Sequence, residues 1–235
     1  IYGIPYEWYE KYGIERLGYH GASHSYVAET LADLYGSTGK AISCHLGGSS
    51  SVCAIRDGKS IDTSFGMSLQ SGLIHATRVG DMDSDLYEFL CHQCLTDAQI
   101  HEGFEQKGGL LGISGVSGDL RYIEAAARDG NRRARLAIDV LVSGIVHYIG
   151  AFYLDLGGLD HLVFTAGMGE NSDLLRRLVC ERLGALGVVL DLEKNAACHG
   201  VRQELTGPGS RVRVFAIPTN EELGIARRTY AYVRG

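Results

Sequence analysis

The hydrophobic and polar positions in the first third of the chain predict three short strands in quick succession. Residues 41–46 form an apolar run, residues 50–56 alternate between apolar and polar, and residues 59–64 continue with strand-like character. Asp57-Gly58 is a typical hairpin turn between the last two strands, and three small residues at 47–49 join the first two. We therefore expect three consecutive antiparallel strands.

Helical periodicity and two further buried strands account for most of the remaining chain. Helices are expected over residues 6–12, 23–34, 84–106, 119–128, 132–156, 174–186 and 221–233, with a glycine-punctuated loop over 108–118. Buried strands are expected at 160–166 and 212–217, each followed by a turn and a helix, and a short strand is considered at 188–190. This order, βββ, then helices, then βαβα, is the core pattern of the ribonuclease H-like α/β fold of actin, Hsp70 and sugar kinases. In that fold a nucleotide binds where strand ends and helix starts converge.

Composition and charge narrow the class of protein. The 235 residues are 45% hydrophobic and 21% charged, which is typical of a globular protein. The net charge of −6 leaves no basic surplus for binding nucleic acid. Neither a signal peptide nor an apolar run of the roughly 18 residues that a membrane span needs is visible. Six scattered cysteines indicate reduced thiols, so a cytoplasmic protein is expected.

Two glycine-containing segments could hold phosphate or nucleotide. The segment 45–51 (HLGGSSS) lies between the first two strands, where backbone N–H groups can approach phosphate oxygens without obstruction by Cβ atoms. The segment 167–171 (GMGEN) follows a buried strand and precedes a helix, as nucleotide-binding turns do. Taken singly, an ordinary flexible hairpin and an ordinary turn explain these segments equally well.

Four other side chains have the chemistry of a phosphoryl-transfer site. The guanidinium of Arg78 could bind the oxygens of a transferring phosphoryl group, and a surface pair with an aspartate is the alternative. His20 and His24 could lie on one helix face and donate to an anion, and structural histidines are the alternative. Glu221 opens the last helix and could hold Mg²⁺, although stabilisation of the helix dipole would explain it as well.

Zinc is the less favoured interpretation of two residue pairs. Cys91 and Cys94 have metal-like spacing, but no second pair follows closely, so thiols on a core helix are the simpler explanation. His20 and His24 lack the intervening glutamate that a zinc hydrolase needs.

Taken in order, these segments resemble the acetate kinase family, which includes propionate and butyrate kinases. The resemblance extends over nearly the whole chain and is carried by residues 18–24, 44–47, 57–64, 77–81, 109–117, 163–172 and 217–223. It implies the duplicated actin-like fold. It also implies reversible transfer of the ATP γ-phosphoryl group to acetate or another short-chain carboxylate, with Mg²⁺ as cofactor, in a homodimer.

The resemblance also implies roles for the residues that match. The side chains expected to contact the transferring phosphoryl group and the carboxylate are His20, His45 and Arg78. The residues expected along the nucleotide are Gly47 and Gly48 at the phosphates, and Asp119, Arg121, Gly167, Met168 and Asn171 around the adenosine. Glu221 is expected to act on the metal.

The family pattern is not matched at four places near the expected acyl and phosphoryl site. Gly48-Ser49-Ser50 stands in place of Asn-Gly-Ala, Leu69 in place of a proline, Tyr19 in place of phenylalanine, and His75-Ala76 in place of Met-Gly. The preferred acid is therefore left open, and so is the phosphoryl donor, since some relatives use pyrophosphate.

The family's amino-terminal half, with a second arginine and a catalytic aspartate, has no counterpart in these 235 residues. We therefore expect the amino-terminal domain to be absent, residues 1–36 to belong to an inter-domain region, and residues 37–235 to form the nucleotide-binding domain. The alternative is a nucleotide-binding or dimerisation module without catalysis of its own.

Overall fold

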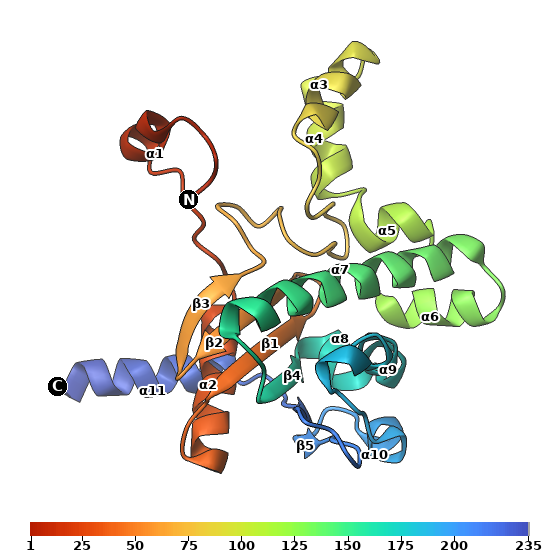
Figure 1. Cartoon of the computed structure of the whole chain (residues 1–235). Coiled ribbons are helices and arrows are strands. Elements are labelled where there is room, and N and C mark those ends of the chain that lie inside the picture. The colour runs from red at the N-terminus through yellow and green to blue at the C-terminus, as the bar shows by residue number, and fades with distance from the viewer. Residues whose placement is uncertain (235) are drawn as a thin grey trace. The chain divides into compact units, whose positions relative to one another are not determined.

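The computed structural model describes residues 1–234, without the side chains at 227, 228 and 231, and consists of two compact units (Figure 1). The first unit comprises Ile1–Tyr19, Gly48–Ser50 and Ser64–Gly144, and the second comprises His20–Gly47, Ser51–Thr63 and the chain from Ile145 onward. The expected division at residue 36 stays a prediction.

A six-stranded sheet forms the centre of the second unit. Its strands follow the order β3-β2-β1-β4-β6-β5, with bounds Lys40–Leu46 (β1), Ser50–Arg56 (β2), Lys59–Thr63 (β3), His161–Thr165 (β4), Gln203–Glu204 (β5) and Arg213–Ala216 (β6). β2 and β3 are antiparallel, β4 is parallel to both β1 and β6, and β5 is antiparallel to β6. The connection between β1 and β2 is too short for a parallel crossover, in agreement with the hairpin expected from the sequence.

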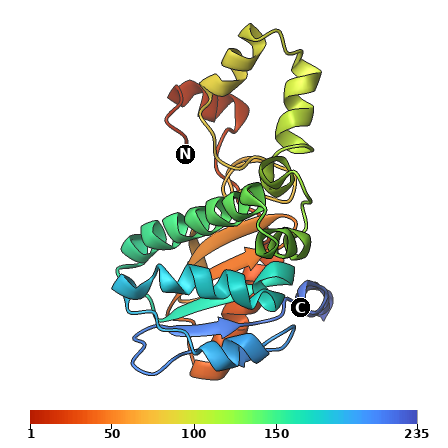
Figure 2. The same cartoon turned by 90° about the vertical axis from the view of Figure 1, so that its right-hand side faces the viewer.

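The central strands are buried along almost their whole length because helices cover both faces of the sheet. Every residue of β4 is buried, as are all but the first of β1 and all but the last of β2. Helix α2 (Gly21–Tyr35) packs on one face through Val27 and Leu31, which share a buried cluster with Ala41, Val163 and Phe215. Side chains alternate along a strand, so their neighbours point to the other face, where α8 (Ala166–Asn171) contacts β1 and β4 (Figure 2).

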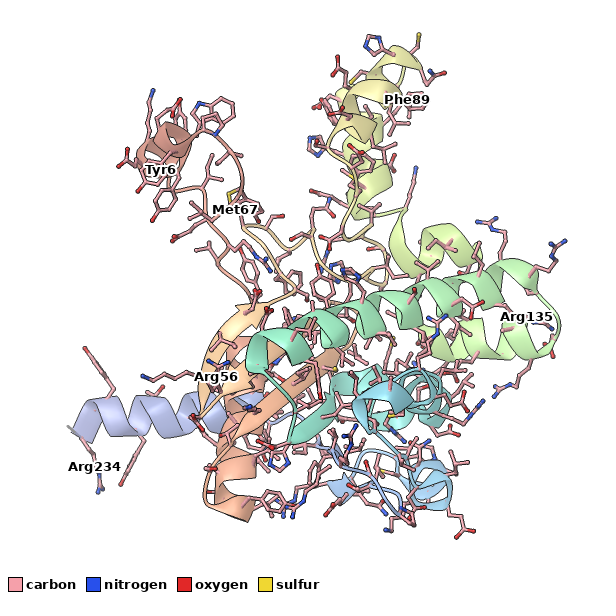
Figure 3. The ribbon with its side chains drawn as sticks, viewed as in Figure 1. Tyr6, Arg56, Met67, Phe89, Arg135 and Arg234 are labelled. Atoms are coloured by element: carbon pink, nitrogen blue, oxygen red, sulfur yellow. The ribbon has the colours of Figure 1, made fainter. Side chains whose placement is uncertain are left out.

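Four further helices complete the second unit. These are α9 (Asp173–Glu181), a short 3₁₀ helix (Gly184–Leu186), α10 (Leu192–Ala197) and α11 (Glu221–Arg234). α11 contacts α2. At the outer end of β2, Arg56 (labelled in Figure 3) donates to the carbonyl of Asp155, which ties the strand to the end of α7 (Arg132–Leu156).

The first unit consists mainly of helices. They are α1 (Tyr6–Tyr12), α3 (Asp85–His92), α4 (Asp97–Glu105), α5 (Gly109–Ser114), α6 (Leu120–Arg128) and the first half of α7. The single helix expected over 84–106 is wrong, because Cys94 has a left-handed backbone (φ 62°) and Thr96 starts α4 with a capping box to Gln99. The loop expected over 108–118 contains α5, which ends at the left-handed Gly115. Phe89 on α3 is largely exposed (Figure 3).

Local structure in the second unit also differs from three expectations. The segment 167–171 is the helix α8 and not an open turn, and the helix expected over 174–186 ends at Glu181 before the 3₁₀ turn. The strand considered at 188–190 is a single bridge between Leu190 and Thr206. α10 and β5 were not predicted, because six-residue and two-residue elements carry too little periodicity to read from a sequence.

Helix α7 matches its predicted bounds and is long and apolar enough, by length and composition, to cross a membrane. Residues Ala137, Leu141, Ile145, Ile149 and Phe152 on one side of it are buried. Leu136 and Leu154 on the other side are exposed. A helix with one buried side and one exposed side is typical of the core of a globular fold.

Arg176 of α9 holds three segments of the second unit together. Its guanidinium is fully buried and donates to the side chain of Asn195 (2.7 Å) and to the carbonyls of Gly169 (2.9 Å), Asn195 (3.0 Å) and Cys198 (2.8 Å). Burying a guanidinium is unfavourable unless its donors are paired, and these four bonds pair them. The arginine therefore links α8 to α10 through α9.

We predict that Arg176→Met lowers the free energy of unfolding by about 3 kcal/mol, because three buried carbonyls and an amide lose their donor. Arg177→Met is the matched control: its neighbouring guanidinium is partly exposed and pairs only with Glu181, at 2.7 Å. That change should cost less than about 1 kcal/mol. Urea unfolding of both variants measures the difference, and equal losses would contradict this role for Arg176.

Candidate functional site

The carboxyl ends of the parallel strands bring several chemically active segments to one edge of the sheet. His45 near the end of β1 lies opposite Thr165, the last residue of β4, and Phe164 lies opposite Ala216, the last residue of β6. α8 begins directly after β4, and the loop 217–220 leads from β6 into α11. Open α/β sheets bind ligands at this edge.

Three histidines lie together at this edge. The rings of His20 and His45 are stacked, with centroids 3.9 Å apart and planes inclined by 24°, and His24 lies 6.4 Å from His20 and 6.2 Å from His45. His20 does not share a helix face with His24, as the spacing suggested, because it is the N-cap of α2 with a left-handed backbone (φ 62°). Such a backbone is uncommon outside glycine and is enriched at functional sites.

Serine hydroxyls are hydrogen-bonded to ring nitrogens of all three histidines. His24 is bonded through Nδ1 to Ser43 (3.0 Å) and through Nε2 to Ser51 (2.8 Å), and Ser51 is also 2.9 Å from Nδ1 of His20. A separate hydrogen bond joins Nδ1 of His45 to the hydroxyl of Ser23, at 2.8 Å.

Burial keeps two of these histidines neutral. The pKa of His24 falls to about 3, first because the ring is desolvated and then because His45 and His20 lie nearby. The pKa of His45 also falls to about 3, through burial and then through His20. Near pH 7 both rings are therefore uncharged, and each offers one N–H donor and one lone pair.

The helix α8 carries three of the residues predicted to bind adenosine. Asn171 donates to the carbonyl of Gly167 (2.9 Å), and open space surrounds the position where Gly167 would carry a Cβ atom. A Cβ atom on Gly169, by contrast, would lie 3.3 Å from the backbone of Phe164. A side chain at 169 therefore requires the backbone of β4 to shift, whereas one at 167 does not. The third residue, Met168, lies between them.

Glu170 connects α8 to the loop before the last helix, since its carboxylate accepts from the backbone N–H of Thr219 (2.9 Å). Glu221 lies in the first turn of α11, and Asn220 caps this helix by accepting from the N–H of Leu223. Among the described residues, no group of three or more His, Cys, Asp or Glu side chains is placed to hold a metal. One carboxylate is compatible with Mg²⁺, which is commonly held by one or two carboxylates together with substrate phosphates and water.

Arg78 belongs to the first unit and does not form the aspartate pair considered from the sequence. Its guanidinium donates to Ser49 (2.5 Å) in the glycine-serine loop, and Asp81 instead accepts from the N–H of Gly72 (2.8 Å). Within the described part of the chain, Nε of Arg78 is buried without a hydrogen-bond acceptor. The carbonyl of Gly48 in the same loop accepts from the N–H of Ala76 (2.9 Å).

Asp119 and Arg121 form a pair in the first unit. Asp119 caps α6 through the N–H of Arg121 (3.0 Å), and its carboxylate also binds the guanidinium, with a shortest distance of 2.6 Å. This bond to Arg121 is the main reason why the pKa of Asp119 is lowered. The side chain of Arg121 remains 85% exposed, so it is accessible to a ligand.

The two cysteines with metal-like spacing are both exposed. Cys91 lies near the end of α3, whereas Cys94 lies after it in the left-handed conformation. The explanation as thiols of a core helix is therefore wrong.

Sequence reasoning missed the residues that hydrogen-bond the histidines or connect the segments around them. Ser23, Ser51, Glu170 and Thr219 lie inside the quoted motifs but were not singled out, and Arg176 was not considered. A polar residue inside an otherwise buried strand or helix would have been a usable signal, because such groups need specific partners.

Comparisons with known proteins agree in one family. A model of the Acetokinase family matches residues 1–227. The acetate kinases of Dictyoglomus turgidum and Treponema denticola are 50% and 46% identical over 99% and 100% of this chain. The crystal structure of Porphyromonas gingivalis acetate kinase superposes with a TM-score of 0.95 at 39% identity over 99% of this chain. The crystal structure of a propionate kinase from Francisella tularensis superposes with a TM-score of 0.90 at 34% identity over 96% of this chain.

The chain spans 58–60% of the length of these relatives. The superpositions confirm the predicted α/β fold of the actin, Hsp70 and sugar-kinase type.

We predict that the buried histidines make the protein less stable in mild acid. Their pKa values are lower in the folded than in the unfolded chain, where the ordinary value is 6.5, so the unfolded state binds more protons below that pH. Stability is lost as pH falls from about 6.5 toward about 3. Each of the two histidines should lower the free energy of unfolding by on the order of 2 kcal/mol between pH 7 and pH 5.

Urea unfolding at pH 7 and pH 5 measures this loss, and His24→Gln should remove the share due to His24. Thr30→Val is the control, because it deletes a hydroxyl elsewhere in α2 that bonds only the carbonyl of Tyr26. If His24→Gln and wild type lost the same stability between the two pH values, the assignment of a neutral, buried His24 would be wrong.

Proposed function

This chain belongs to the acetokinase family, and from that premise we propose that it carries the nucleotide side of an acyl kinase. The reaction is reversible transfer of the γ-phosphoryl group of ATP to acetate or another short-chain carboxylate, which gives ADP and an acyl phosphate. The observation that carries the proposal is the stacked pair of His20 and His45 at the edge of the sheet where α8 begins. The resemblance of residues 18–24 and 44–47 to the family motifs supports a role for this pair at the transferring group.

Phosphoryl transfer needs positioning and charge stabilisation more than covalent help from the protein. In the proposed site, His20 and His45 donate N–H groups to the equatorial oxygens of the phosphoryl group and to the carboxylate. Arg78 supplies the positive charge. Its buried Nε has no acceptor in the described part of the chain, which is consistent with a guanidinium that still has to meet an anion.

The nucleotide is proposed to lie along the backbone of Gly47 and Gly48 and against α8, at Gly167, Met168 and Asn171. Asp119 and Arg121 are proposed to flank the adenosine from the other side. Glu221 would hold Mg²⁺, which neutralises phosphate charge when it is bound.

The remaining proposals follow the family. The protein is proposed to be a cytoplasmic homodimer that binds neither nucleic acid nor membranes. The 235 residues by themselves are proposed to bind nucleotide without robust turnover. The alternative, a nucleotide-binding or dimerisation module, differs in that the complete gene product would bind ATP but form no acyl phosphate.

We predict that the complete gene product forms acyl phosphate from ATP and that Arg78→Ala lowers kcat by roughly a hundred- to a thousandfold. Loss of one preorganised donor costs about 3–4 kcal/mol of transition-state stabilisation. Trapping the acyl phosphate with hydroxylamine, with acetate, propionate and butyrate in parallel, measures the product.

Arg128→Ala is the control for this experiment, because Arg128 is an exposed arginine at the end of α6 and should be dispensable. No product with any of the three acids would contradict the kinase proposal. Product formation that is unchanged in Arg78→Ala would contradict the role of Arg78.

We also predict that Gly167→Ala weakens ATP binding on the order of tenfold without loss of stability. The protein itself leaves room for the added methyl group, and alanine favours the helix, so only a bound nucleotide would meet the new Cβ atom. Gly150→Ala in α7 is matched, because that glycine is also helical with open space around it. Isothermal titration with ATP and thermal unfolding are the measurements; equal ATP affinity in both variants would place the nucleotide elsewhere.

A further inference from the structure

The hydroxyl of Ser51 lies between two imidazole rings. Its Oγ atom is 2.8 Å from Nε2 of His24 and 2.9 Å from Nδ1 of His20, and Ser51 is completely buried. A serine hydroxyl has one proton to donate, so it can donate to only one of the two nitrogens and must accept from the other. The protonation of His20 at Nδ1 is therefore coupled to that of His24.

When both rings are neutral, two arrangements of protons have Ser51 donating within this chain of bonds; in a third, both rings donate to Ser51. In the first, Ser43 donates to His24, His24 donates to Ser51, and Ser51 donates to Nδ1 of His20, whose own proton is then on Nε2. In the second, every bond is reversed, and Nε2 of His20 carries a lone pair. The distance from Ser43 to Nδ1 of His24, 3.0 Å, is compatible with either direction.

The bonds behind His45 favour one direction. The hydroxyl of Thr219 donates to Ser23 at 3.2 Å, so the proton of Ser23 is available for Nδ1 of His45, 2.8 Å away. When Ser23 donates to Nδ1 of His45, the ring proton of His45 lies on Nε2. A matching arrangement in His20 gives each of the two stacked rings an N–H group at Nε2.

We propose that Ser51, backed by His24, and Ser23, backed by Thr219, are positioning residues that hold the ring proton of His20 and of His45 on Nε2. An imidazole held in this way presents an N–H donor at Nε2 in place of a lone pair. A lone pair facing a phosphoryl oxygen would be repulsive, whereas an N–H group stabilises the charge on it. The significance for catalysis rests on the function proposed above, but the position of the protons does not.

The position of each ring proton can be read directly from the 235-residue chain labelled with ¹⁵N-histidine. Long-range ¹H–¹⁵N correlation spectra distinguish a protonated ring nitrogen from an unprotonated one. We expect the proton on Nε2 in both His20 and His45 of the wild type at pH 7. A proton on Nδ1 of either ring overturns the proposal for that ring, and this reading needs no variant.

Variants then test which serine controls which ring. Ser51→Ala should change the ¹⁵N signals of His20 and leave its proton distributed over both nitrogens, while His45 is unaffected. Ser23→Ala should change the ¹⁵N signals of His45 and leave those of His20 unaffected. Ser51→Thr keeps the hydroxyl and should restore the wild-type spectrum of His20. Ser25→Ala, which removes a hydroxyl of the same helix that bonds the carbonyl of Ala22, should change neither ring. A folded Ser51→Ala chain with an unchanged His20 would show that Ser51 does not control it.

The catalytic consequence is measured with the complete gene product. Ser51→Ala should lower kcat on the order of tenfold with little change in KM for ATP, and Ser51→Thr should recover it. Equal rates in Ser51→Ala and wild type would overturn the catalytic part of the proposal. If the wild-type protein forms no acyl phosphate while the spectra show both protons on Nε2, the proposed function fails and the positioning inference stands.

Discussion

The register of the three parallel strands is the constraint on which the candidate site depends. Because β1, β4 and β6 pair in parallel, their carboxyl ends meet at one edge, and the segments that follow them converge there. Side-chain alternation then decides which residues face α2: Ser43 and His45 lie on the same side as Ala41 and Val163 of the buried cluster. A shift of one residue in β1 would turn His45 away from His20.

The histidine–serine network is the polar end of that same helix–sheet interface. Toward the other end of α2, Val27 and Leu31 bury apolar surface against the sheet, whereas His24 meets serine hydroxyls nearer its start. Buried polar groups are tolerated when they are hydrogen-bonded, and here the bonds run from strand to helix. The same burial keeps His24 and His45 neutral near pH 7, and their hydrogen bonds fix rings that would rotate if they were exposed.

The helix α8, which is proposed to bind nucleotide, depends on a second buried polar group, the guanidinium of Arg176. Arg176 fixes the backbone of α8 at Gly169, and Glu170 connects α8 to the loop before α11. The open space at Gly167 is therefore bordered by backbone that cannot easily shift. Rigid backbone beside an open position is the arrangement that a preorganised binding site requires.

The sequence by itself determined the order of the elements, the sheet-forming runs and the segments that carry the chemistry, because hydrophobic periodicity and glycine-containing turns are local signals. The break of 84–106 into two helices was only half readable: Thr96 and Gln99 carry the capping-box pattern that starts the second helix, but the left-handed backbone of Cys94 has no sequence requirement. Nor could the sequence select Ser23, Ser51 or Arg176, whose roles exist only where strands and helices far apart in the chain meet. Only the tertiary structure decided that His20 stacks on His45 while His24 stands behind them, because long-range pairing of β1 with β4 and packing of α2 set those distances.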